Sequence, residues 1–315
     1  MNTDIIVIGS SNTDFIMKME RLPRKGETIT NAVFMQTFGG KGANCAVGAA
    51  RANGNVTFVN CVGDDPFGPL IIENMQRAGV KTDCILRAQG IASGSALVMI
   101  DANGDNYLSV APGANYRLLP EHIVDLTPRI AKAALIVLQY EILPETLYAS
   151  IDLAHSLGKQ ILFNFAPARP IDERYFSKIT HLVVNEVEAE YLCGFPVSSE
   201  AQAYVAAESL LQQVAEAVVI TLGGRGAVAV DRSGCFHAPA YPVNAVDSTA
   251  AGDIFCGTLA VALVEGNSLP DSVRFANAAA AISVTRLGAQ PSAPTRQEIK
   301  QYLETGSTTC QCNKQ

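Results

Sequence analysis

Short runs of β-branched and other apolar residues alternate with amphipathic segments along most of the chain. Apolar runs occupy 4–9, 56–62, 135–138, 160–165, 182–184 and 217–222. Helical patterns occupy 145–157, 201–214 and 272–284. Short continuous apolar runs suit strands that are buried on both faces, as in a parallel sheet. The pattern therefore predicts an α/β fold built on a doubly wound, mostly parallel sheet.

Two segments interrupt this alternation. Residues 14–20 alternate between the two faces of a strand, and 95–100 and 107–110 flank Asn103-Gly104, a pair that favours the positive φ angles of a tight hairpin. Because a hairpin is out of place in a βαβ series, we expect these segments to form a small sheet that covers one face. The predicted single domain spans 1–305, with a β-sheet lid from about 11–36 and 93–110, and a flexible tail at 306–315.

Composition narrows the class of protein. The 315 residues are 48% apolar and 17% charged, which is typical of a compact globular protein. The net charge of −7 and the absence of a Lys/Arg block argue against a nucleic-acid partner. No apolar stretch reaches membrane-spanning length, and no signal-like segment begins the chain. We therefore expect no membrane partner and a cytoplasmic location.

The most informative stretch is 247–253, Asp-Ser-Thr-Ala-Ala-Gly-Asp, which opens directly into the apolar run 254–264. The first backbone N–H groups of a helix lack partners and attract anions, and small residues leave them uncovered. Asp253 lies in the same turn. A carboxylate beside an anion site is what a phosphoryl transferase needs. An ordinary capped helix explains the same residues about equally well.

Polar residues also gather near the first predicted strand and the segment after it. Asn12 and Asp14, two residues apart, offer donors and acceptors to adjacent sugar hydroxyls, although such residues are also common turn formers. Residues 39–44, Gly-Gly-Lys-Gly-Ala-Asn, lack the spacing of a P-loop. Their glycines instead allow close approach to a small ligand, with Lys41 and Asn44 contacting its hydroxyls.

More polar residues end the later predicted strands. In open α/β sheets, ligands bind at the carboxyl ends of strands, so these residues should converge on one crevice. They are Glu141, Asn164, Asn185 with Glu188, and the segment 221–226.

The motifs at 39–44 and 247–253 together resemble the paired signatures of the ribokinase (PfkB-like) carbohydrate kinases. The resemblance extends from Val7 to Ser292. It implies a ribokinase-like fold with Asp253 as the catalytic base. It implies that the sugar is held by Asn12, Asp14, Gly40, Lys41, Asn44, Glu141 and Asp253. It implies that the nucleotide is bound by Asn185, Thr221, Gly223, Arg225, Gly226, Ala251, Gly252 and Asn277.

The resemblance also implies two metal ions and a dimer. Mg²⁺ would accompany ATP, ordered through water by Glu188. A monovalent cation, K⁺, would be held by Asp247, Thr249, Ser283, Arg286, Gly288 and Ser292. The lids of two subunits would pair into a homodimer. Three positions depart from the family pattern: Ser248 stands where Thr is usual, Asn277 where His is often found near adenine, and Thr13 between the two sugar-facing residues.

The expected reaction is in-line transfer of the γ-phosphoryl of ATP to the primary hydroxyl of a pentose, with D-ribose, giving ribose 5-phosphate, as the first expectation. A related kinase of deoxyribose, another sugar or a nucleoside is the alternative. A dinucleotide-dependent oxidoreductase requires GxGxxG after the first strand, and residues 9–12, Gly-Ser-Ser-Asn, lack it. A silent sugar-binding regulator is disfavoured because both the base and the anion site are present.

Overall fold

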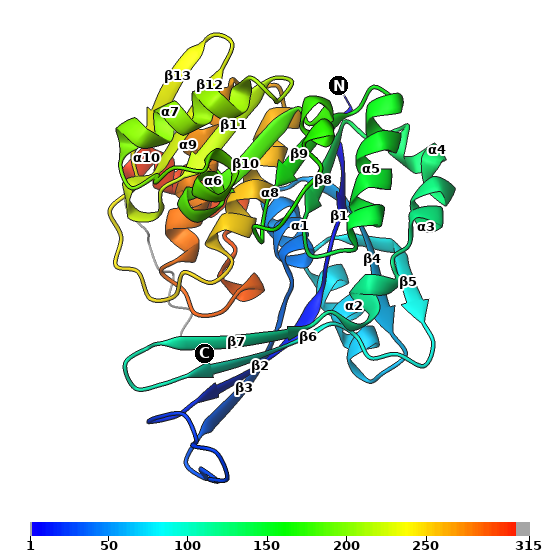
Figure 1. Ribbon diagram of the computed structural model, residues 1–315, viewed down its shortest axis with the longest axis vertical. Coiled ribbons are helices and arrows are strands. Elements are labelled where there is room, and N and C mark those ends of the chain that lie inside the picture. Colours follow the sequence, from blue (N-terminus) through cyan, green and yellow to red (C-terminus); the bar gives the residue numbers. More distant parts are fainter. Residues whose placement is uncertain (1, 307–315) are drawn as a thin grey trace.

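Two β-sheets of different size organise the chain (Figure 1). The computed structural model describes residues 2–306, so the predicted tail lies, apart from Gly306, outside the described residues. The large sheet contains, in spatial order, β13 (Gly234–Ala238), β12 (Ala227–Asp231), β11 (Ala217–Thr221), β10 (His181–Asn185), β9 (Gln160–Asn164), β8 (Leu135–Gln139), β1 (Asp4–Ile8), β4 (Asn55–Gly63) and β5 (Lys81–Ala88). All strands from β11 to β5 are parallel, whereas β12 and β13 form an antiparallel extension at one edge. The predicted mostly parallel sheet is confirmed.

Helices cover both faces of this sheet. One face carries α3 (Pro120–Asp125), α4 (Thr127–Ile130), α5 (Pro144–Ser156), α6 (Glu186–Cys193) and α7 (Glu200–Leu211). The other carries α1 (Lys41–Arg51), α2 (Phe67–Arg77), α8 (Ala251–Val264), α9 (Leu269–Ser283) and α10 (Arg296–Thr305). The arrangement is the doubly wound one that the sequence predicts.

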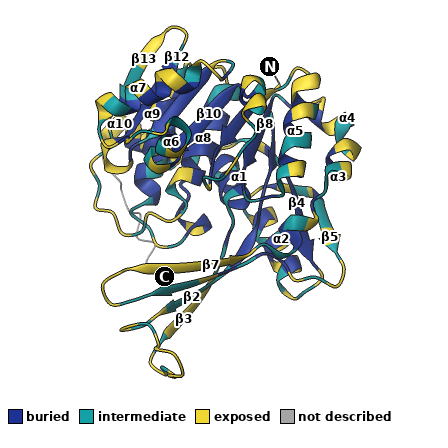
Figure 2. Ribbon diagram, viewed as in Figure 1, coloured by how far each residue is buried: buried dark blue, intermediate teal, exposed yellow. Residues whose placement is uncertain are grey.

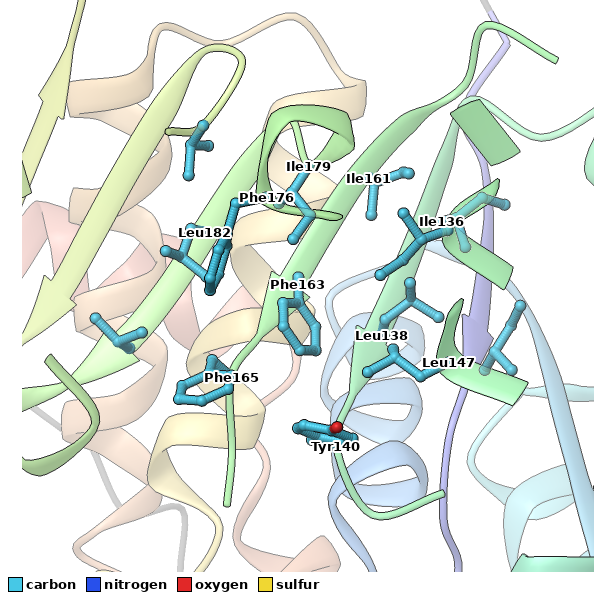
Figure 3. Close-up of a cluster of buried hydrophobic side chains, with 14 of the residues drawn as sticks. Ile136, Leu138, Tyr140, Leu147, Ile161, Phe163, Phe165, Phe176, Ile179 and Leu182 are labelled. Atoms are coloured by element: carbon cyan, nitrogen blue, oxygen red, sulfur yellow. The ribbon is translucent and has the colours of Figure 1, made fainter. Parts of the chain in front are cut away.

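Strand β8 shows why its apolar run is continuous. Ile136 and Leu138 pack into the core on one face, together with Phe163 of the neighbouring strand (Figure 3). Leu135 and Val137 pack into the core on the other face. Because successive strand residues point to opposite faces, burial on both faces requires an apolar residue at every position.

The small sheet contains β3 (Val33–Gly39), β2 (Asn12–Lys18), β6 (Ser95–Ile100) and β7 (Asn106–Ala111), in that spatial order. β2 pairs antiparallel with β3 and parallel with β6, and β6 and β7 form the predicted hairpin. The sheet extends away from the helix-covered body, and most of its residues are partly or fully exposed (Figure 2). It corresponds to the small sheet that the sequence predicts.

Several elements differ from the sequence-based expectation. β3, β5, β12 and β13 were not anticipated, because three of them lie at sheet edges, where the apolar run is shorter or interrupted. Helix α1 begins at Lys41, inside the glycine-containing motif 39–44. The glycines of the motif suggest a loop, but Gly39 ends β3, Gly42 lies within α1, and only Gly40, with φ of 90°, separates the strand from the helix. Across residues 2–306, the structure contains no helix with the length and apolar character needed to cross a membrane.

Candidate active site

The start of helix α8 has the geometry of an anion site. Ala250 precedes the helix in a left-handed conformation, with φ of 62°, and the next N–H to find a helical acceptor is that of Ile254. Among the described residues, no acceptor faces the N–H groups of Gly252 and Asp253. A Cβ added at Gly252 would meet no atom within 4 Å. Two backbone donors therefore border open space beside a carboxylate.

The Asp253 side chain is 7% exposed and is held by one neighbour. Its Oδ2 accepts a hydrogen bond from Asn44 Nδ2 at 2.9 Å. Burial raises the pKa of Asp253, and the nearby Lys41 ammonium opposes that shift. A buried carboxylate with a raised pKa is a stronger base than an exposed one, which suits proton abstraction.

Close packing of α1 against α8 brings Asn44 and Asp253 together. A Cβ at Gly257 of α8 would lie 2.2 Å from the carbonyl oxygen of Cys45, so this helix crossing tolerates no side chain there. On α1, a Cβ at Gly48 would lie 3.1 Å from Ile254 Cα. Two glycines that look like ordinary helix residues in the sequence therefore set the distance between the two motifs.

Lys41, the first residue of α1, faces several acidic groups. The Asp253 carboxylate raises the pKa of Lys41, burial opposes this, and Glu141 and Glu188 raise the pKa further. Its backbone N–H donates to Glu141 Oε2 at 3.1 Å. The structure thus gathers one cation and three carboxylates contributed by α1, α6, α8 and the segment after β8.

The carboxyl group of Asp14, on β2, has a raised pKa and lies against the neighbouring strand β3. Burial, with a contribution from the Glu141 carboxylate, raises the pKa of Asp14 to about 7. A Cβ at Gly39 on the paired strand would lie 2.1 Å from Asp14 Oδ2, so glycine at 39 makes room for this carboxylate. Asp14 therefore lies against Gly39 at the cavity wall, with a carboxyl pKa near neutral pH.

A cavity of about 880 Å³ lies between the small sheet, the first residues of α1, the start of α8 and the turn at 287–291. Apolar side chains of the lid, such as Ile16 and Val98, form part of its wall. Every residue that the sequence predicts for the sugar lines it: Asn12, Asp14, Gly40, Lys41, Asn44, Glu141 and Asp253. The structure thus brings together residues more than 200 positions apart, as in the hydrogen bond between Asn44 and Asp253.

None of the residues predicted for the nucleotide lines this cavity. Asn185, Thr221, Gly223 and Arg225 lie at or just after the carboxyl ends of β10 and β11, whereas Ala251 and Gly252 begin α8 and Asn277 lies in α9. Asn185 and Glu188 cap α6 reciprocally: the Asn185 N–H donates to Glu188 Oε2 at 2.8 Å, and the Glu188 N–H donates to Asn185 Oδ1 at 2.9 Å. Thr221 is opposite Asn185 in the parallel register. A Cβ at Gly223 would meet no atom within 4 Å, so this strand end also borders open space.

Three other predicted nucleotide residues have partners within the protein. The Arg225 guanidinium contacts Glu186 and the Ser198 carbonyl, its N–H donates to the Leu222 carbonyl at 3.1 Å, and its own carbonyl lies 2.9 Å from His237 Nε2. Asn277 Nδ2 donates to the Ala238 carbonyl at 3.0 Å. A Cβ at Gly226 would lie 2.0 Å from that same carbonyl oxygen, so Gly226 and Asn277 meet at Ala238. Ala251 and Gly252 lie at the start of α8.

The residues predicted for a monovalent cation are joined through Asp247. Its Oδ1 accepts from the Thr249 N–H and its Oδ2 from the Gly288 N–H, each at 2.9 Å. Burial favours a higher pKa for Asp247, but these hydrogen bonds outweigh it and lower the pKa. The Ser283 carbonyl accepts from the Arg286 N–H at 3.0 Å.

The remaining groups of this segment are also occupied within the protein. The Arg286 guanidinium pairs with Glu298, and the Ser292 hydroxyl donates to the Ala289 carbonyl at 2.7 Å. A carboxylate and backbone carbonyl oxygens are the kinds of ligand that suit a hard cation, and this segment contains both. Within residues 2–306, no three His, Cys, Asp or Glu side chains gather as a side-chain metal site.

Sequence reasoning missed three residues at the site. The Ser10 hydroxyl donates to Glu141 Oε2, and the buried amides of Asn60 and Asn115 lie behind Asn12. Asn60 could have been identified from the sequence, because it places an amide side chain inside the otherwise mostly apolar run 56–62. A fully buried polar residue in such a strand needs partners, which points to a polar network.

Comparison with known proteins gives a consistent result. The model of the pfkB family of carbohydrate kinases matches residues 2–296. A deoxyribokinase of Salmonella typhi is 38% identical over 301 residues, covering 95% of this chain and 98% of that protein. A ribokinase of Bacillus subtilis is 36% identical over 300 residues, covering 95% and 99%. The solved structure of Arabidopsis thaliana ribokinase in complex with ribose and ATP superposes with a TM-score of 0.91 at 31% identity, covering 96% and 99%.

Proposed function

Because this chain belongs to the pfkB family of carbohydrate kinases, we propose that it transfers the γ-phosphoryl group of ATP to the primary hydroxyl of D-ribose, forming ribose 5-phosphate. The observation that carries this proposal is the position of Asp253. Its carboxylate faces the same cavity as the polar residues suited to a sugar, and lies in the helix turn whose N–H groups face open space. An acceptor hydroxyl and a phosphoryl group thus have adjoining sites.

In this mechanism Asp253 takes the proton from the attacking hydroxyl. Burial raises the pKa of Asp253, which strengthens it as a base, and Asn44 fixes its orientation through one oxygen. The N–H groups of Gly252 and Asp253 stabilise negative charge on the phosphoryl group as it moves. Lys41 balances the acidic groups around the cavity and offers a donor to the sugar or the phosphate.

The donor chemistry near Glu188 suits a Mg²⁺ that arrives with the nucleotide. This carboxylate is buried, which raises its pKa, and the Lys41 ammonium opposes the shift. A lone protein carboxylate is typical of Mg²⁺ sites in which phosphates and water supply the other ligands. Bound Mg²⁺ would neutralise phosphate charge, and Glu188 would order its water shell.

A monovalent cation, K⁺, is proposed for the segment around Asp247. The supporting observation is that one ionised carboxylate ties residue 249 to the turn at 288, next to the start of α8. Thr249, Ser283, Arg286, Gly288 and Ser292 would contribute oxygens, mostly backbone carbonyls. A cation there would hold the anion site of α8 in position without touching the sugar.

Deoxyribose is the second candidate acceptor, and the 38% identity to a deoxyribokinase favours it. The polar content of the cavity supports ribose instead. Asn12 and Asp14 point from the same face of β2 toward the cavity, offering a donor and an acceptor to neighbouring hydroxyls. A substrate that lacks one of these hydroxyls, as 2-deoxyribose does, would leave a polar group of the site without a partner. Such a site discriminates strongly against that substrate.

The test is ADP release over a panel of ribose, 2-deoxyribose, hexoses and nucleosides, with K⁺ and Na⁺ compared. We expect the highest kcat/KM with ribose and a requirement for K⁺. A higher kcat/KM with 2-deoxyribose would move the assignment to the second candidate. Turnover of none of these acceptors would reject both.

A homodimer formed through the lid is also proposed. Three large apolar side chains on the outer strands share one face of the small sheet and are exposed: Val33 at 61%, Leu108 at 65% and Val110 at 45%. An apolar patch of this kind on a sheet is a common association surface. Sedimentation of the wild type and of a Val33→Ser, Leu108→Ser variant tests this, with a monomeric variant as the expected result. The cytoplasmic location stays a prediction.

A further inference from the structure

A chain of buried amides lies directly behind Asn12. Asn60 is fully buried, and Asn115 and Ser11 are each 1% exposed. Asn60 belongs to β4, and Asn115 to the short 3₁₀ helix at 113–117 that follows β7. These elements are far apart in sequence, yet their side chains meet at the first residues of β2.

The hydrogen bonds made by the Asn60 and Asn115 amides are 2.7 to 3.1 Å long, which fixes the orientation of both side chains. Asn115 Oδ1 accepts from the Ser11 N–H at 2.9 Å and from Asn60 Nδ2 at 3.0 Å. Asn115 Nδ2 donates to the Ser11 carbonyl at 3.1 Å and to Asn12 Oδ1 at 3.0 Å. Asn60 Nδ2 also donates to the Gly9 carbonyl, and Asn60 Oδ1 accepts from the Ser11 hydroxyl, each at 2.7 Å.

Backbone groups determine which way each amide points. A backbone N–H only donates and a carbonyl only accepts, so Ser11 forces the oxygen of Asn115 to one side and its nitrogen to the other. The Gly9 carbonyl fixes Asn60 in the same manner. Because the nitrogen of Asn115 then faces Asn12, the oxygen of Asn12 must turn toward it. Glycine at position 94 leaves room for this contact between Asn115 and Asn12, because a Cβ added there would lie 2.3 Å from Asn12 Oδ1.

The result is that Asn12 presents its amide nitrogen to the cavity. Among the described residues, Asn12 Nδ2 has no hydrogen-bond partner, although the residue is only 4% exposed. We propose that Asn60 and Asn115 are positioning residues that hold Asn12 as a hydrogen-bond donor to one sugar hydroxyl. The inference rests on the proposed function of the cavity.

This orientation makes the site selective. A hydroxyl both accepts and donates, so one placed near Asn12 and Asp14 can accept from the amide and donate to the carboxylate. Both residues line the cavity from the same face of β2. If Asn12 were turned over, its carbonyl oxygen and the ionised Asp14 carboxylate would both be acceptors, and the hydroxyl would satisfy only one of them. This contrast applies above the Asp14 pKa of about 7, where that carboxylate has lost its proton.

The sharpest variant is Asn115→Asp, which keeps the shape of the side chain but replaces its donating nitrogen by oxygen. We expect the KM for ribose to rise about tenfold or more, the usual cost of one mismatched buried hydrogen bond. We expect kcat and the KM for ATP to change less than about twofold. Asn60→Ala, which removes one support of Asn115, should raise the sugar KM by a smaller factor.

A control variant and a double-mutant cycle of Asn12 and Asn115 separate a positioning role from a general loss of structure. Thr146→Ala removes another buried hydrogen bond, from its hydroxyl to the Leu118 carbonyl at 2.6 Å, and should leave both KM values unchanged. In an Asn12→Ala background, Asn115→Asp should have little further effect on the sugar KM, because the residue it orients is gone. Equal effects in both backgrounds, or a parallel rise in the KM for ATP, would overturn the inference.

If one variant does not fold, as judged by its melting temperature, the cycle is completed with Asn60→Ala. If ribose is not a substrate but another sugar of the panel is, the acceptor assignment fails and the cycle is run with that sugar. If no sugar is turned over, the same cycle is read from ribose dissociation constants measured by calorimetry. An additive result there overturns the positioning role separately from the proposed activity.

Discussion

The protonation of Asp14 gives the most quantitative test of the site. Burial and the Glu141 carboxylate raise the pKa of Asp14 from 3.8 to about 7 in the folded protein. In the unfolded chain the group titrates near its ordinary value. Between these two values the folded state keeps a proton that the unfolded state has lost. The free energy of unfolding must therefore fall as pH rises through this window.

The size of the effect follows from the width of the window. One unit of pKa corresponds to about 1.4 kcal/mol, so a shift of about three units corresponds to about 4 kcal/mol as an upper value. From pH 5 to the folded-state pKa of about 7 the window covers about two of those units. Between pH 5 and 8 the contribution of Asp14 to the free energy of unfolding should therefore fall by about 2 to 3 kcal/mol. Asp14→Asn has no such proton. The variant should therefore gain stability relative to the wild type as pH rises.

The assay is urea unfolding of both proteins at pH 5, 6, 7 and 8 without ligands. Asp65→Asn is the matched control, because hydrogen bonds from Ser93 and the backbone outweigh burial and lower the pKa of Asp65. A carboxylate with a lowered pKa stabilises the folded protein by the same amount at every pH well above its ordinary pKa. The stability lost in Asp65→Asn should therefore be constant from pH 5 to 8. If the difference between Asp14→Asn and wild type is also constant, the proposed protonation of Asp14 is refuted.

Three other predictions concern separate parts of the site. Asp253→Asn should lower kcat by about 10² to 10⁴ with little change in the sugar KM, measured by ADP release, and near-normal turnover would remove its role as base. Gly257→Ala should destabilise the protein by about 1 to 3 kcal/mol in urea unfolding, because its Cβ would lie 2.2 Å from the Cys45 carbonyl oxygen; an unchanged midpoint would contradict the close crossing of α1 and α8. Asp247→Ala should abolish the difference in rate between K⁺ and Na⁺, whereas a retained K⁺ response would place the cation elsewhere.

The sequence by itself determined the fold class and the two principal motifs. Continuous apolar runs such as 135–138 can be buried only with cores on both sides, and this predicts the doubly wound sheet. The small residues at 250–252 similarly predict an uncovered helix start, because no side chain is present to fill it. These are local consequences of residue type, so they do not depend on which segments later meet.

Only the tertiary structure decided how those parts act on one another. The hydrogen bond from Asn44 to Asp253 depends on two helices crossing at Gly48 and Gly257, and nothing near either residue in sequence announces the other. The raised pKa of Asp14 depends on burial and on Glu141, which lies more than 120 positions away. Hydrogen-bond partners, burial and electrostatic fields are properties of three-dimensional proximity. A single sequence specifies the groups that carry the chemistry, and the packing of distant segments sets their orientation and charge.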